Sequence, residues 1–265
     1  MALRLLTAAA SETGNFRSTN QDAAFTAPWG AAVADGVGGG PSGDLASATL
    51  VHRLVAGGMR ITDGEDLAVR VRLANWDLSA QVRRNPELQG MATTFTGLVV
   101  TTGGDLLLAH IGDSRAYRLR HAQLERQTRD DSYVQALVDR GLLSAQAAAS
   151  HPRRNIITAS LRGGEADTVT VASCETLVGD RWMLCSDGVS DYLDDEEIGM
   201  ALLSHRTPEE AAEALVAQAL AFGSRDNVTA VVCDVAEGAA DAAAPPQFHG
   251  SARELFQEDL DLTAS

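Results

Sequence analysis

Short runs of apolar and β-branched residues, separated by Gly, Asp and Asn, recur along most of this 265-residue chain. Each run is shorter than a typical helix and is bounded by turn-forming residues, a pattern that predicts β-strands. The predicted strands are 3–10, 23–27, 30–35, 93–101, 105–113, 115–120, 167–173, 181–187 and 227–235. A chain with this many short strands is expected to fold around sheets rather than as a helical bundle.

Pairs of helical segments interrupt the strands. The predicted pairs are 44–55 with 65–84 and 196–203 with 208–221, and a further helical stretch covers 132–150. Thr207 and Pro208 are a typical N-cap and first helical residue, and acidic residues follow them. Runs of strands broken by helix pairs differ from the regular alternation of a parallel sheet. The sequence therefore predicts an α+β layered domain with mainly antiparallel sheets.

The composition changes after about Val235, where Ala, Asp and Pro become frequent. We predict one globular domain over residues 1–236 and an acidic Ala/Pro linker and tail over 237–265. Within the tail, residues 251–262 place Leu255, Phe256 and two further leucines among acids, a pattern that can form a short docking helix. A disordered tail is the favoured interpretation for such a terminus.

The overall charge argues against several classes of partner and mechanism. The formal net charge is −15, and a surface of this sign is poorly suited to nucleic acid. All 21 basic residues are arginine, so no mechanism based on a lysine is open to the chain. No stretch reaches the roughly 18–20 apolar residues of a membrane span, and the three separated cysteines resemble reduced thiols. We expect a cytoplasmic protein with no membrane association.

Four aspartates occupy the same local setting, at the end of a predicted strand or in the turn beside it. They are Asp35, Asp113, Asp187 and Asp226. Any one of them alone is more readily explained as a turn residue. As a group at the edge of a core, they would raise one another's pKa unless a cation lay among them. Mg²⁺ or Mn²⁺ prefers such oxygen ligands, and Gly36 would let its carbonyl approach the ion without a side chain in the way.

Arg17 lies in a polar segment that precedes the second predicted strand. Its planar guanidinium is suited to binding a phosphate through two hydrogen bonds. A solvent-exposed loop explains the same residues equally well, and the sequence pattern by itself leaves both alternatives open.

Taken in chain order, seven segments resemble the metal-dependent serine/threonine protein phosphatases of the PPM type, also called type 2C, in their bacterial form. The segments are SETGNFRSTNQDA, VADGVGGGPSGDLAS, GMATTF, LAHIGDSRAYRLR, TRDDSYVQALVDRGLLSAQAAASHPRRNIIT, MLCSDGVSD and SRDNVTAVV. Each motif alone is weak, but together they follow the order and spacing of the family from Ser11 to about Val232.

The resemblance implies a four-layer αββα sandwich of two mainly antiparallel sheets flanked by helix pairs. It also implies a site for two Mn²⁺ or Mg²⁺ ions, in which Asp35 bridges the ions and the Gly36 carbonyl binds one of them. Asp187 and Asp226 would hold the other ion. Asp113, with Asp187, matches the site of a third, weaker ion of bacterial members, and Arg17 would bind the substrate phosphate. Residues 143–164 fall where the family carries a flap beside the active site.

Two positions depart from the pattern of many relatives. Gln21 stands where many have Glu, although bacterial relatives also use Gln there. Val37 stands where animal relatives have a histidine that is thought to protonate the leaving group, and valine carries no proton to donate. His151 is a candidate for that task by its place in the flap segment, and a turn-forming role is the alternative.

The expected activity is therefore hydrolysis of phosphoserine and phosphothreonine in proteins by a metal-activated water. The expected partners are phosphorylated proteins, with a serine/threonine kinase and its substrates among them, and the chain is expected to be a monomer. The alternative is a catalytically weak module of the same fold that binds phosphoproteins or regulates a kinase.

Overall fold

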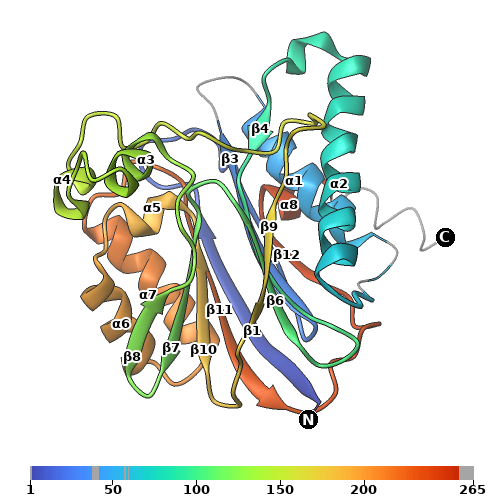
Figure 1. Cartoon of the computed structure of the whole chain (residues 1–265), viewed down its shortest axis with the longest axis vertical. Helices are drawn as coiled ribbons and strands as arrows, with labels where there is room; N and C mark the ends of the chain where they lie inside the picture. Colours follow the sequence, from blue (N-terminus) through green and yellow to red (C-terminus); the bar gives the residue numbers. More distant parts are fainter. Residues whose placement is uncertain (1, 38–41, 57, 59, 257–265) are drawn as a thin grey trace.

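The computed structural model describes residues 2–37, 42–56, 58 and 60–256, and two antiparallel sheets form its centre (Figure 1). The first sheet has the order β1-β11-β10-β7-β8, and the second has the order β12-β2-β3-β5-β6-β9, with β4 beside β3. The strands are β1 (Leu3–Glu12), β2 (Asp22–Ala27), β3 (Gly30–Val37), β4 (Ala92–Thr93), β5 (Phe95–Val100), β6 (Leu106–Ile111), β7 (Arg115–Arg120), β8 (Gln123–Arg126), β9 (Thr170–Cys174), β10 (Arg181–Cys185), β11 (Val228–Glu237) and β12 (Gln247–Gly250).

Helices cover the outer faces of both sheets. The helices are α1 (Gly43–Val55), α2 (Gly64–Arg84), α3 (Tyr133–Asp139), α4 (Ala145–Ala149), α5 (Asp187–Ser190), α6 (Asp195–Ser204), α7 (Pro208–Ala221) and α8 (Ser251–Leu255), with a 3₁₀ turn at Pro86–Leu88. The predicted helix pairs are present, and Thr207 caps α7 through a reciprocal capping box with Glu210. The same device, between Asp194 and Glu197, begins α6.

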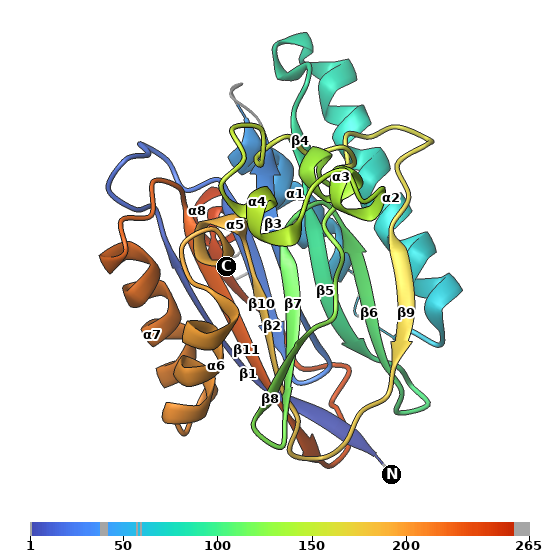
Figure 2. The same cartoon turned by 60° about the vertical axis from the view of Figure 1, so that its left-hand side comes forward.

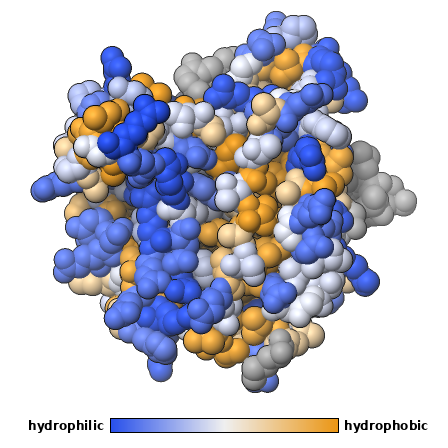
Figure 3. All heavy atoms as spheres, viewed as in Figure 1, coloured by the Kyte–Doolittle hydropathy of each residue, from blue (hydrophilic) through white to orange (hydrophobic). Residues whose placement is uncertain are grey.

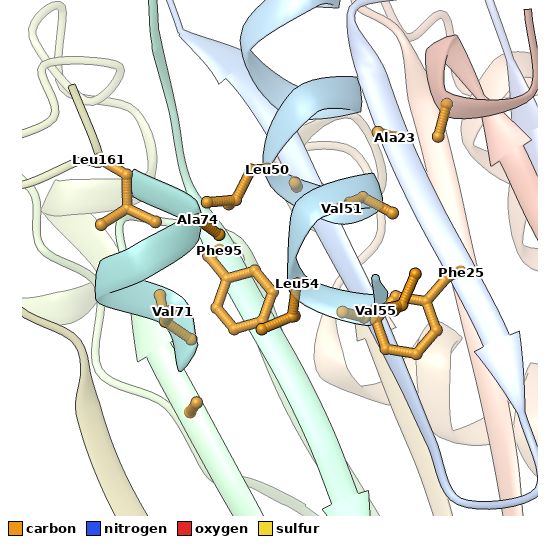
Figure 4. Packing of buried hydrophobic residues seen from close by; sticks show 14 of the residues in the cluster. Ala23, Phe25, Leu50, Val51, Leu54, Val55, Val71, Ala74, Phe95 and Leu161 are labelled. Carbon is orange, nitrogen blue, oxygen red and sulfur yellow. The ribbon is translucent and has the colours of Figure 1, made fainter. Parts of the chain in front are cut away.

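Three separate apolar layers hold the four structural layers together. One lies between the second sheet and helices α1 and α2, where Phe25, Leu54 and Phe95 are fully or almost fully buried (Figure 4). A second lies between the first sheet and helices α6 and α7. The third lies between the two sheets and includes Trp182 and Leu98. A strand that packs on both faces is expected to be mostly apolar, and β2 and β5, which are buried along their whole length, fit this pattern. The αββα sandwich is confirmed.

The short turn after β6 carries the chain from one sheet to the other. β6 ends at Ile111 in the second sheet, and β7 begins at Arg115 in the first. Gly112 has a positive φ of 108°, and a Cβ there would lie 2.6 Å from the Thr94 side chain, so glycine is required at this turn. The turn brings the ends of both sheets together at one edge, and Asp113 lies within it.

The C-terminal region differs in part from the predicted disordered tail. Residues 247–255 form β12 and α8, and β12 extends the second sheet by pairing with β2. Trp29 Nε1 donates a hydrogen bond to the Ala244 carbonyl at 2.9 Å, so the connection before β12 also rests on the domain. The short docking helix is therefore present as α8, whereas the part of the predicted helix beyond residue 256 lies outside the described residues.

Within the part of the chain that the structure describes, no helix combines the length and the hydrophobicity that a membrane crossing requires.

Candidate active site

The predicted aspartates gather where the two sheets end together. Asp35 lies in β3, Asp113 follows β6, and Asp187 opens α5 two residues after the end of β10. Asp226 comes two residues before β11. Because paired antiparallel strands begin and end at shared edges, these positions meet at the edge where β6 crosses to β7. The carboxylates of Asp113, Asp187 and Asp226 all act electrostatically on Asp35, so the structure brings the four together as predicted.

A fifth aspartate, Asp22, belongs to the same cluster and had no predicted role. It is the first residue of β2 and pairs directly with Asp35 of β3. Its Oδ2 accepts a 2.7 Å hydrogen bond from Ser186 Oγ, which links the second sheet to the end of β10 in the first. Asp22 directly follows Asn20 and Gln21 at the end of a polar loop, so it has the same position at a strand edge as the other four. That position was the available signal.

Arg17 lies beside the cluster and contacts it directly. One of its terminal nitrogens is 2.7 Å from Asp226 Oδ2, and the Arg17 side chain is 46% exposed. Asn227 fixes the loop that carries Arg17, because its amide donates to the carbonyls of Thr13 and Thr19. Its Oδ1 accepts from the backbone N–H of Gln21. Asn227 was not predicted, since one Asn in a turn has no distinctive sequence pattern.

Three carboxylate oxygens in the cluster have no donor to accept from. Asp22 Oδ1, Asp113 Oδ1 and Asp187 Oδ1 are buried and have no hydrogen-bond partner among the described residues. A buried polar atom without a partner costs about 1–3 kcal/mol, and more if it is charged. Three such atoms at one edge are therefore a strong indication of a ligand that supplies positive charge.

The raised pKa values of the clustered aspartates also indicate a site for a cation. Burial raises the pKa of Asp22 to about 6, although the hydrogen bond from Ser186 opposes the rise. Burial, followed by nearby carboxylates, raises the pKa of Asp113 to about 7. Burial and then repulsion from Asp22 and Asp187 raise the pKa of Asp35 well above its ordinary value, and burial and then Asp113 raise that of Asp187. Carboxylates in this arrangement need either protons or a cation.

The donor set fits a hard divalent cation. Carboxylate and carbonyl oxygens are the ligands that Mg²⁺ and Mn²⁺ prefer, and both ions commonly retain several waters. Within residues 2–37, 42–56, 58 and 60–256, no group of three or more His, Cys, Asp or Glu side chains is already arranged to hold a metal ion. The protein therefore offers anionic oxygens at one edge rather than a closed cage of side chains.

Gly36 has a structural requirement that the sequence interpretation did not include. A Cβ at Gly36 would lie 2.4 Å from the backbone of Gly43, the first residue of α1. Glycine is therefore needed for the close approach of β3 to α1, whether or not its carbonyl binds an ion. Gly188 is similar, because a Cβ there would lie 1.9 Å from the Asn227 carbonyl oxygen.

A cavity of about 790 Å³ opens beside Asp113 and Asp187. Helices α3 and α4 form one wall and α5 and α6 the other, and Figure 2 shows α3 and α4 across this end of the sheets. Arg154 joins the walls through a 3.2 Å ion pair with Asp191. Figure 3 shows hydrophobic residues mixed with hydrophilic ones on the surface over α3 and α4, and Leu142, between these two helices, is 68% exposed.

His151, the candidate proton donor in this region, takes part in a hydrogen bond within its own turn. His151 Nδ1 accepts a 3.1 Å hydrogen bond from the backbone N–H of Arg153, which favours the turn-forming alternative. Val37 pairs with Ala92 of β4 and presents no titratable group.

The fold and the carboxylate-lined edge match a known class of proteins. The family described as protein phosphatase 2C matches residues 17–222. A crystal structure of the catalytic domain of the serine/threonine protein phosphatase PstP in complex with two manganese ions aligns with a TM-score of 0.80. It is 38% identical and covers 89% of this chain and all of that one. The chain belongs to the protein phosphatase 2C family.

Relatives at the sequence level agree with this assignment. The serine/threonine protein phosphatase PstP of Mycobacterium tuberculosis is 41% identical over 246 residues, which cover 89% of this chain. The chain spans 46% of the length of that relative. The serine/threonine phosphatase stp of Listeria welshimeri is 32% identical over 213 residues, which cover 76% of this chain and 82% of the relative.

Proposed function

We propose that this chain is a metal-dependent protein phosphatase that hydrolyses phosphoserine and phosphothreonine. The observation that carries the proposal is the set of three buried carboxylate oxygens without donors, on Asp22, Asp113 and Asp187, at the edge where Arg17 also lies. A cation would satisfy these oxygens, and an arginine next to a cation is suited to a phosphate group. Membership of the family supports the same activity.

Two Mn²⁺ or Mg²⁺ ions fit the site, with the ligands assigned by the resemblance. We assign Asp35 as the bridging ligand, the Gly36 carbonyl to one ion, and Asp187 and Asp226 to the other. Asp113 and Asp187 are assigned to a third, weaker ion. When bound, such ions polarise a phosphoryl oxygen and lower the pKa of a bound water. The crystal structure of the PstP catalytic domain with two manganese ions supports the number and the kind of ions in this proposal.

Arg17 binds and orients the phosphate in this proposal. Its partly exposed guanidinium can point toward solvent while Asp226, 2.7 Å away, holds it at the edge of the cluster. The planar group offers paired N–H donors that match two phosphoryl oxygens. Because Val37 has no proton to donate and His151 is not among the residues that line the cavity beside Asp113 and Asp187, we infer that a solvent water protonates the leaving group.

The substrates proposed are phosphorylated proteins, with a serine/threonine kinase that acts on the same proteins. The names of the relatives, serine/threonine phosphatases, support this class. The exposed Leu142 and Ile156, which lie close in sequence to cavity-lining residues such as Ala145 and Asn155, also suit a polypeptide better than a small phosphate ester. The three cysteines, none of them in a disulfide, are compatible with the reducing cytoplasm, where we propose that the chain acts as a monomer.

The decisive experiment measures hydrolysis of para-nitrophenyl phosphate and of a phosphothreonine peptide with added Mn²⁺. Asp187→Asn keeps the size of the side chain but removes its charge, and we expect a loss of at least about 100-fold in kcat. Glu196→Gln is a matched control, because Glu196 lines the same cavity but lies on the exposed first turn of α6. An unmodified chain that binds phosphopeptide but remains inactive with Mn²⁺ would support the binding-module alternative instead.

A further inference from the structure

The C-terminal segment β12–α8 lies beyond residue 222, where the match to the family ends, yet it contacts the strand that begins the site. β12 pairs with β2 from Gln247↔Thr26 to Gly250↔Ala23, so the next residue, Ser251, lies beside Asp22. Figure 1 shows α8 next to α1, close to the sheet. The segment is thus joined to the edge of the molecule that carries the aspartate cluster.

Helix α1 holds this segment through an aromatic stack. The His52 ring stacks on the Phe248 ring with 3.9 Å between centroids, and the Phe256 ring lies 4.5 Å from it. His52 Nε2 is 2.7 Å from the Ala252 carbonyl oxygen. Both ends of the segment are therefore fixed to α1, and Ser251 between them is 1% exposed.

Ser251 bonds to the main chain of Asp22. Its hydroxyl donates to the Asp22 carbonyl oxygen at 3.0 Å, and it also lies 3.0 Å from the Ser47 hydroxyl of α1. The Ser47 hydroxyl donates to the carbonyl oxygen of Gln21 at 2.6 Å. Two buried serines from different helices therefore hold consecutive carbonyl groups at the start of β2.

The same carbonyl groups connect to the other side of the site. The Gln21 carbonyl oxygen also accepts from the backbone N–H of Gly36 at 3.1 Å. Gly250 has a positive φ of 60°, and a Cβ there would lie 2.2 Å from the Asp22 carbonyl oxygen. Only glycine allows the segment to come this close, so a side chain at residue 250 would push directly on Asp22.

We propose that Ser251 is a positioning residue for the metal centre, through which the C-terminal segment holds the backbone of Asp22 and Gln21 in place. Without its hydroxyl, the start of β2 is less constrained, so Asp35, which lies opposite Asp22, and the Gly36 carbonyl are less well aligned for the cation. Groups that orient metal ligands in this way typically change metal affinity by about 10-fold or more. The inference rests on the proposed function, because it assumes that the cluster binds Mn²⁺.

Mn²⁺ affinity of full-length Ser251→Ala, measured from the electron paramagnetic resonance signal of free Mn²⁺, tests the proposal. We expect the Kd to rise about 10-fold relative to the unmodified chain. His249→Ala is the control, because it removes the 3.1 Å contact between the His249 ring and the Thr26 hydroxyl of β2 and leaves the Ser251 hydroxyl in place. Because the Ser251 hydroxyl keeps its hydrogen bond to the Asp22 carbonyl in this variant, the Mn²⁺ affinity is expected to stay within about twofold of the original.

A measurement on the unmodified chain covers the case in which Ser251→Ala fails to fold. Coupling between two sites is reciprocal, so Mn²⁺ must stabilise the segment if the segment helps to bind Mn²⁺. We expect Mn²⁺ to slow amide exchange in residues 247–256 and to leave β8, at the far edge of the first sheet, unchanged. Equal Mn²⁺ affinity in Ser251→Ala, or no slowing in 247–256, would overturn the inference while leaving the proposed function intact. An unmodified chain that binds no Mn²⁺ would refute the proposed function instead.

Discussion

Asp22 and Asp35 lie directly opposite each other on neighbouring strands, so two aspartates share one rung of the β2–β3 ladder. Side chains at such positions are about 5 Å apart and point to the same face of the sheet. Like charges there are unfavourable, yet nearby Asp113, Asp187 and Asp226 add further negative charge. A bound cation would compensate this negative charge. Without a cation, the repulsion between the carboxylates lowers the stability of the fold, which leads to the first prediction.

In the presence of a chelator, the chain should become less stable as the pH rises from about 4 to about 7. The pKa of Asp22 is raised to about 6 and that of Asp113 to about 7, so the folded chain binds more protons than the unfolded chain in this range. Stability then falls with pH, by on the order of a few kcal/mol in total. Chemical denaturation with EDTA at several pH values measures the slope.

Saturating Mn²⁺ should reverse this dependence. The ion binds the deprotonated carboxylates, so its stabilising effect is greatest near neutral pH and is lost as protons compete at lower pH. A stability that rises with pH in EDTA as well as in Mn²⁺ would contradict the raised pKa values of Asp22 and Asp113.

Arg17→Ala should lower kcat/KM for a phosphopeptide by about 100-fold, because a charged donor to the phosphate is lost. The Mn²⁺ affinity should not fall, since the substitution also frees Asp226 from its 2.7 Å ion pair. Arg225→Ala is the matched control, because it removes another exposed arginine from the same region. The Arg225 guanidinium lies over the Phe16 ring, 5.4 Å from the ring centre. A similar loss in both variants would show a general charge effect rather than a specific phosphate contact.

Gly36→Ala should destabilise the fold by about 1–3 kcal/mol even with no metal present, because the added methyl would overlap the backbone of Gly43. Gly199→Ala in α6 serves for comparison, since a Cβ there meets only ordinary contacts with Leu124 at 3.8 Å and the helix gains up to about 1 kcal/mol. Urea denaturation in EDTA gives both values. Equal stability of Gly36→Ala and the unmodified chain would mean that α1 can shift away from β3.

Alkylation with iodoacetamide should leave phosphatase activity intact. Cys185 and Cys233 are buried, and burial raises the pKa of the Cys185 thiol to about 12. Reaction requires the thiolate, so these cysteines should remain largely unmodified in the folded chain. Mass spectrometry before and after treatment, paired with an activity assay, checks both points. Inactivation that follows modification of one cysteine would reveal a role for a thiol that the proposed mechanism does not include.

Most of the fold was predictable because its central strands carry their own pattern. β2, β5 and β6 are mostly apolar, because both faces of each strand are buried. The edge strands β8 and β12 were not predicted. Each has four residues with polar or mixed side chains, and each exists because a longer neighbour supplies the hydrogen bonds.

The sequence by itself determined the order of strands and helices, the family resemblance, and the four strand-edge aspartates with Arg17 as candidates. These follow from local periodicity, turn chemistry and motif order, which need no knowledge of distant contacts. Only the tertiary structure placed Asp22 opposite Asp35, joined it to Ser186, and packed Ser251 against its carbonyl. Those contacts join residues 13 to 229 positions apart, and such pairings depend on how the layers pack rather than on any local signal.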